Sequence, residues 1–252
     1  MLVDTHCHLD MLEDLDGALE RMRAVGVERA VTIGVDRASS EWAARAARTH
    51  ADVWATVGLH PHDAKDQSEA VMKMLEHLAA TEERVVGVGE AGLDYHYDNS
   101  PREQQRAVFA EQVAMAKRVG KALVIHTREA WDDTFEILAA AGPPDRIVFH
   151  CFSGGPAEAT RALDAGATLS FAGVVTFKNA GDLREAARIT PLDRLVVETD
   201  SPFLTPVPNR GRPNEPAYVS HVAEAIATVK GVPVEELARA TSENAARLFG
   251  WV

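Results

Sequence analysis

Short apolar runs, many of them β-branched, alternate along the chain with longer segments in which apolar residues recur every three or four positions. The short runs predict eight strands, at residues 2–6, 29–35, 53–61, 85–90, 122–127, 146–152, 167–173 and 194–200. The longer segments predict helices at 14–26, 39–50, 67–80, 101–119, 128–142, 156–166 and 179–189, with further helices after residue 215. The tetrapeptide Ser100-Pro101-Arg102-Glu103 predicts a capping box at the start of the fourth helix.

The strands are continuously apolar, which is typical of parallel strands buried on both faces. Eight strands, each followed by a helix, predict an α/β fold, a (β/α)8 TIM barrel with extra C-terminal helices. We expect residues 1–252 to form one domain of this kind. The alternative is an open doubly wound sheet, which normally carries a glycine-rich turn after its first strand, but the sequence there is HCHLDML and contains no glycine.

Composition and charge argue against several classes of function. The chain is 46% hydrophobic and 25% charged, as in ordinary globular proteins, and its two cysteines form no disulfide framework. No apolar stretch has the roughly 18 residues needed to cross a bilayer and no signal peptide is visible, so we expect a cytoplasmic protein without membrane contact. The net charge of −12 argues against binding nucleic acid through a general positive field, so an anionic substrate needs a local cationic site. No stable protein partner is indicated.

Histidines gather at the ends of the predicted strands. Five of the ten histidines end a strand, and in TIM barrels this end of the strands carries the active site. Side chains alternate along a strand, so two histidines on either side of Cys7 point the same way. Together with the acids that end strands four and eight, the predicted metal ligands are His6, His8, Glu90, His126, His150 and Asp200.

Four histidines and two carboxylates are too many for one tetrahedral zinc ion. They suit two divalent ions about 3.5–4 Å apart. Glu90 is the expected bridge, with Asp200 on one ion and His126 on the other. A metal-bound water then supplies a hydroxide nucleophile whose proton Asp200 accepts, so the predicted reaction is hydrolysis. The predicted catalytic residues are Asp200, Glu90 and His60, the last as a contact to substrate or transition state, and the ions are Mg²⁺, Mn²⁺ or Zn²⁺.

These residues lie in motifs that resemble a known family. The segments VDTHCHLD, GLHP, GEAGLDY, IHTRxAxxD, FHCFSG, ETDSPFL, NEPAYV and TSENAARLF, in this order and spacing, resemble the TatD-type metal-dependent deoxyribonucleases over essentially the whole chain. The resemblance implies a TIM barrel of the amidohydrolase type and a nuclease that trims DNA ends, chiefly as a 3′→5′ exonuclease on single strands. The ligands of the family map onto the six residues named above.

Basic residues near the same strand ends are candidates for phosphate binding, because the arginine fork binds two oxygens at once. They are Arg128, Lys178, Arg210 and Arg212. For the last two, the alternative is a solvated loop. Members of the family often carry another basic residue where this chain has Pro213, which leaves one phosphate contact in question.

Two other functions remain open. The same chemistry serves hydrolysis of an ester, amide or lactone, but relatives of that type often bridge their metals with a modified lysine on strand four. Here strand four ends in Glu90, and no lysine occurs between Lys73 and Lys117. A non-catalytic binding barrel is the third possibility; such a barrel is expected to lose ligands, and none of the six is missing.

Overall fold

A computed structural model describes residues 2–251 of the chain. Its eight strands form one sheet in the order β1 to β8, and the paired strands run parallel. A helix follows each strand, with 3-10 turns between several elements. The predicted (β/α)8 fold is confirmed, since strands in simple chain order with intervening helices are the topology of the TIM barrel.

The residues group into two compact units, one formed by 2–32 and 150–248 and the other by 33–149 and 249–251. The prediction of a single domain over 1–252, whose first and last residues lie outside the described range, stays a prediction. Among residues 2–251, no helix combines the length and the apolar character required to cross a bilayer.

The first unit holds both ends of the strand series. Its elements are β1 (Leu2–Cys7), α1 (Leu15–Ala24), β2 (Val27–Ile33), α6 (Pro156–Asp164), β7 (Thr168–Phe171), α7 (Gly181–Ile189), β8 (Leu195–Val197), α8 (Val219–Lys230) and α9 (Val234–Phe249). A parallel bridge pairs Cys7 with Ser201, so the end of β1 lies beside the segment that follows β8. This pairing brings together residues that are almost two hundred positions apart in the sequence.

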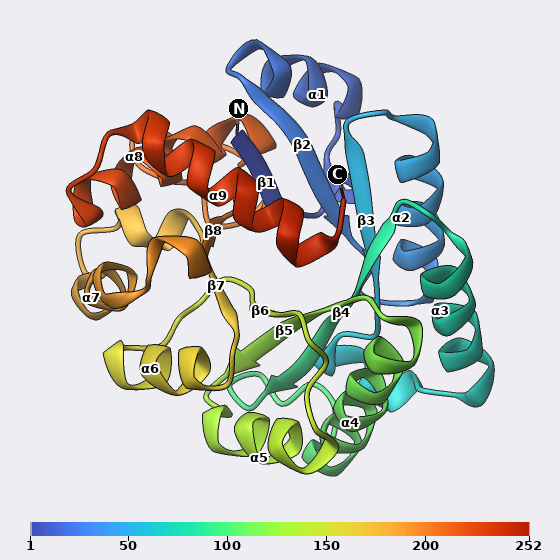
Figure 1. Cartoon of the computed structure of the whole chain (residues 1–252). Helices are drawn as coiled ribbons and strands as arrows, with labels where there is room; N and C mark the ends of the chain where they lie inside the picture. The colour runs from blue at the N-terminus through green and yellow to red at the C-terminus, as the bar shows by residue number, and fades with distance from the viewer. Residues whose placement is uncertain (1, 252) are drawn as a thin grey trace. The chain divides into compact units, whose positions relative to one another are not determined.

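The second unit holds the middle of the series. Its elements are α2 (Arg37–Thr49), β3 (Val53–Val57), α3 (Glu69–Thr81), β4 (Val85–Asp94), α4 (Arg102–Val119), β5 (Ala122–Arg128), α5 (Trp131–Ala141) and β6 (Ile147–Phe149), with a 3-10 turn, η2 (Pro61–Asp66), after β3. Helix α2 packs on β3, and α4 packs on β4 (Figure 1). The core between these helices and strands is apolar, as the continuous hydrophobic runs predict.

Strand β4 is longer than the sequence pattern indicates. We expect it to end at Glu90, but it runs on to Asp94 and is buried throughout. Its register against β5 shifts between Val88 and Ala91, after which Gly92 lies opposite His126. Four further residues of strand follow the irregular pairing at Glu90. They keep β4 paired with β5 as far as Asp94.

The predicted capping box at α4 is wrong. The helix begins at Arg102 with Pro101 as its N-cap, and no side chain caps it. The Ser100 hydroxyl instead donates to the His62 carbonyl at 2.7 Å and accepts from the Lys65 amide at 3.1 Å. Ser100 therefore stabilises the 3-10 turn η2, a distant segment that the local sequence pattern does not reveal.

Candidate metal centre

Two histidines at the end of β1 face a single carboxylate that follows β8. The Nε2 atoms of His6 and His8 lie 3.6 and 3.4 Å from Oδ1 of Asp200. The Asp200 amide donates to the His6 carbonyl at 2.9 Å, and the His8 amide donates to the Ser201 carbonyl at 2.7 Å, so the backbone holds the two segments together. Donor atoms of the three side chains lie within 4.8 Å of one another. The structure brings these three predicted ligands together, and their binding of a metal stays a prediction.

The alternation along β1 follows the predicted pattern. The Cys7 thiol is buried and donates to the Val31 carbonyl at 3.3 Å, away from the imidazoles on either side of it. Strand β1 ends at Cys7, so His8 lies one residue beyond it. Cys7 is a packing residue.

The charge on Asp200 depends on its histidine neighbours. Burial disfavours the ionised carboxylate, but the hydrogen bond from His8 and the positive charges of His6, His8 and His150 outweigh it and lower the pKa of Asp200. An ionised carboxylate is the form that binds a cation. The imidazoles around Asp200 therefore favour the state that a metal ligand requires.

His150 follows β6 and lies against the same group. Its ring stacks on that of His6, with centroids 3.9 Å apart and planes 13° from parallel. Its Nδ1 lies 3.3 Å from Oε1 of the buried Glu198, which also accepts from the Cys151 amide at 2.7 Å and, through Oε2, from the Ser170 hydroxyl. A carboxylate on the second nitrogen of a ligand histidine is a common way of orienting the ring. Cys151 is half-buried.

Asp4 is a buried acid to which the sequence analysis assigned no role. Its carboxylate accepts from the backbone amide of Thr199 at 2.8 Å and from the Thr199 hydroxyl. Burial raises the pKa of Asp4 to about 8, although the bonds from Thr199 act in the other direction. Asp4 thereby links β1 to the residue directly before Asp200, which helps to hold that ligand in place.

A second group of candidate ligands lies in the other unit. The Oε1 atom of Glu90 lies 2.7 Å from Nδ1 of His126 and 3.4 Å from Nε2 of His60. Donor atoms of these three side chains are again within 4.8 Å of one another. His60 follows β3, whereas Glu90 and His126 lie in the carboxyl-terminal halves of the neighbouring parallel strands β4 and β5, which explains their convergence. His60 therefore shares a group with two predicted ligands, and its role as a substrate contact stays a prediction.

His60 is held as a neutral imidazole. Its Nδ1 accepts a hydrogen bond from the His62 amide at 3.1 Å, so the ring proton lies on Nε2, toward Glu90. Burial is the main cause that lowers the pKa of His60 to about 4, although the Glu90 charge acts in the other direction. His60 is therefore a hydrogen-bond donor at neutral pH, which suits a contact to developing negative charge.

The pKa of His60 predicts how stability changes with pH. The folded state binds no proton at His60 above about pH 4, whereas the unfolded chain binds one below about pH 6.5, so this contribution to stability is lost as the pH falls from 6.5 to 4. One pKa unit is about 1.4 kcal/mol, so the loss reaches about 3 kcal/mol. We expect the free energy of unfolding, measured in urea with metal chelated, to fall between pH 6.5 and 4 by about 3 kcal/mol more in the wild type than in His60→Gln. Parallel curves of stability against pH for the wild type and His60→Gln would contradict this prediction. The control is His77→Gln, which changes an exposed histidine on α3.

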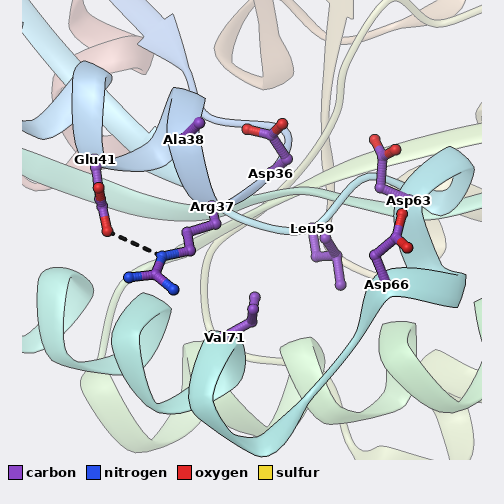
Figure 2. A pocket seen from close by; sticks show the side chains of 8 residues that line it. All are labelled: Asp36, Arg37, Ala38, Glu41, Leu59, Asp63, Asp66 and Val71. Carbon is purple, nitrogen blue, oxygen red and sulfur yellow. Dashed lines mark hydrogen bonds and ion pairs between the residues drawn. The ribbon is translucent and has the colours of Figure 1, made fainter.

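A pocket of about 300 Å³ lies next to His60, between α2, the end of β3, η2 and α3 (Figure 2). Its lining residues are Asp36, Arg37, Ala38, Glu41, Leu59, Asp63, Asp66 and Val71. The one arginine is paired with Glu41 at 3.2 Å. Burial, together with the charges of Asp36 and Asp66, raises the pKa of Asp63. This pocket is too acidic to hold a phosphate, and none of the predicted phosphate-binding residues lines it.

The predicted phosphate-binding residues are distributed over several strand ends. The guanidinium of Arg128, the last residue of β5, lies 4.8 Å from the centre of the Tyr97 ring. Arg210 stacks at 4.0 Å on Phe177 and donates to the Thr205 carbonyl, which places it beside the segment that carries the exposed Lys178. Arg212 is exposed on the same loop as Arg210. The stacking orders Arg210, and phosphate binding by all four residues stays a prediction.

Comparison with known proteins identifies the relatives of this chain. The family model described as TatD related DNase matches residues 3–250. The chain belongs to the TatD family. Relatives of this TatD protein include the metal-dependent hydrolase YabD of Bacillus subtilis, 44% identical over 99% of both chains. The metal-dependent hydrolase TatD of Mycobacterium tuberculosis is 40% identical over 99% of this chain and 98% of its own. The family is therefore one of metal-dependent hydrolases.

Solved structures agree with this assignment. The TatD homologue YjjV of Escherichia coli superposes with a TM-score of 0.95 at 28% identity, covering 100% of this chain and 98% of the other. A variant of organophosphorus hydrolase from Deinococcus radiodurans matches with a TM-score of 0.66 at 16% identity, over 99% and 92% of the two chains. The second likeness extends to the fold alone.

Proposed function

We propose that this TatD protein is a divalent-metal-dependent deoxyribonuclease that hydrolyses phosphodiester bonds, acting as a 3′→5′ exonuclease on single-stranded DNA. The observation that carries the proposal is the convergence of His6 and His8 on Asp200, with a second convergence of His60 and His126 on Glu90. Both groups combine imidazole nitrogens with carboxylate oxygens, a donor set that fits Mn²⁺ or Zn²⁺ and, through its oxygens, Mg²⁺.

The proposal keeps the six ligands and the two ions predicted from the sequence. When bound, such ions polarise a phosphoryl oxygen and lower the pKa of a bound water. The neighbours of Asp200 keep it ionised, so it is able to accept a proton during the reaction. His60 is neutral and presents an Nε2–H, so it is able to donate to an oxygen that gains negative charge.

The proposed substrate also needs cationic side chains to hold its phosphates. Arg128, Lys178, Arg210 and Arg212 would bind them, because a guanidinium binds two phosphate oxygens at once and an ammonium attracts phosphate as a point charge. The chain as a whole carries a net charge of −12, so binding relies on these local residues and on the metals. We therefore expect affinity for DNA to fall steeply as salt is added.

One experiment tests the substrate, the polarity and the metal together. Protein stripped of metal is incubated with single-stranded DNA carrying a label at the 5′ end, and Mg²⁺, Mn²⁺ and Zn²⁺ are restored one at a time. We expect no cleavage by the stripped protein and, with the correct ion, a ladder of labelled products that shortens from the 3′ end.

Internal cuts without a ladder would contradict the exonuclease proposal. Intact DNA with every ion, combined with metal-dependent cleavage of an aryl ester or a lactone, would replace the nuclease by another hydrolase. The Asp200→Asn protein, purified in the same way, controls for contaminating nucleases.

A further inference from the structure

Asp94, the last residue of β4, is a buried carboxylate outside the predicted ligand set. Its Oδ1 accepts from the backbone amides of His96 and Tyr97 at 3.0 and 2.9 Å. Its Oδ2 lies 3.0 Å from Nε2 of His62 and 3.3 Å from Nε2 of His126. One oxygen is thus occupied by the backbone, and the other is directed at two imidazoles.

The sequence of β4 explains this placement. Glu90, Gly92 and Asp94 are spaced two residues apart, and Gly92 pairs with His126 on β5. Since Gly92 has no side chain, its backbone lies close to that of His126, whose carbonyl oxygen a Cβ at this position would overlap. Its Nδ1 lies 2.7 Å from Oε1 of Glu90, while its Nε2 faces Asp94.

We propose that Asp94 is a positioning residue that holds His126 with its proton on Nε2, so that Nδ1 is the atom that binds the metal beside Glu90. A neutral imidazole carries one N–H, and an ionised carboxylate only accepts. Both nitrogens of His126 face a carboxylate, Nδ1 at 2.7 Å from Glu90 and Nε2 at 3.3 Å from Asp94. A metal on Nδ1 would exclude the proton from that atom, and Asp94 would then accept it from Nε2 and fix the plane of the ring. This inference rests on the proposed metal centre, and on no particular substrate.

Asp94 is able to act in this way because its carboxylate is held in place. The two backbone amides fix the carboxylate plane, so Oδ2 does not turn away from the rings. The Asp94 amide is held in turn by the buried Gln105 at 2.8 Å.

The test uses the full chain labelled with ¹⁵N and loaded with Zn²⁺. Long-range ¹H–¹⁵N spectra report which nitrogen of each imidazole is protonated, and the His126 signals are assigned by their absence in His126→Asn. We expect His126 to be protonated on Nε2. In Asp94→Asn we expect zinc affinity to fall about 10- to 100-fold, measured by competition with a chromophoric chelator.

The matched control is Glu129→Gln, which removes a carboxylate from an exposed histidine, His96, whose Nδ1 lies 2.8 Å away. It should change neither the His126 spectrum nor the zinc affinity. A wild-type His126 protonated on Nδ1 would overturn the inference, and so would an Asp94→Asn protein that binds zinc as tightly as wild type. Where Asp94→Asn fails to fold, a wild-type His126 protonated on Nδ1 would still overturn the inference.

Neither readout involves DNA, so the two proposals fail separately. The expected spectrum and zinc affinity in a protein that cleaves no DNA would refute the nuclease and leave the role of Asp94 in place. DNA cleavage with His126 protonated on Nδ1 would do the reverse.

Discussion

Asp200→Asn is expected to reduce hydrolysis by about 10²- to 10⁴-fold, the range for loss of a group that transfers a proton in the transition state. Asparagine keeps the size of the side chain and its hydrogen-bonding oxygen, but it neither accepts a proton nor carries the charge that a cation requires. His6 and His8 both face this one carboxylate, so metal affinity should fall as well. The measurement is kcat on single-stranded DNA at saturating metal, with bound metal counted by elemental analysis.

The fold of Asp200→Asn should persist, because the backbone bonds that place this residue use its amide, not its carboxylate. Asp193→Asn is the matched control, an exposed acid in the short turn before β8. It should cleave at the wild-type rate. Wild-type cleavage by Asp200→Asn at saturating metal would show that Asp200 is not the proton acceptor.

Gly92→Ala is expected to destabilise the protein by about 3–5 kcal/mol, combining steric overlap with backbone strain. A Cβ at this position would overlap the carbonyl oxygen of His126 on the paired strand, and the φ angle of Gly92 is +152°, which side chains rarely adopt. The backbone has to move to relieve the overlap, and it would carry His126 with it. We expect a lower urea midpoint, measured by circular dichroism, and weaker zinc binding by the fraction that stays folded.

Gly120→Ala separates the two causes. Gly120 ends α4 with φ at +64°, but its Cβ would meet no atom within 4 Å. Only strain should act there, at a cost of about 1–2 kcal/mol, with zinc affinity unchanged. Equal losses in the two variants would mean that the close approach of β4 to β5 contributes nothing.

Much of the fold is predictable from local sequence patterns. Each predicted strand is present, because a buried parallel strand must be apolar along its whole length and this is visible in a single segment. Strand ends were harder to predict: we expect β4 to stop at Glu90, but the strand continues through this buried acid, which contacts His60 and His126, and ends at Asp94. Such partners lie outside any local window.

The same limit explains why the predicted capping box at α4 is wrong. Ser100 has the right local sequence for a helix cap, yet its hydroxyl bonds to His62 and Lys65, whose positions depend on how η2 packs against α4. A local propensity of about 1 kcal/mol is overridden when a tertiary contact satisfies the same group.

The sequence by itself determined the fold class, the family motifs and the candidate histidines and acids, since each depends on the spacing of residues within a segment. Only the tertiary structure decided which side chains face one another: His6 and His8 on Asp200, His150 on Glu198, and His126 between Glu90 and Asp94. The reason is physical, because an imidazole takes its orientation and its tautomer from partners that are close in space but far apart along the chain.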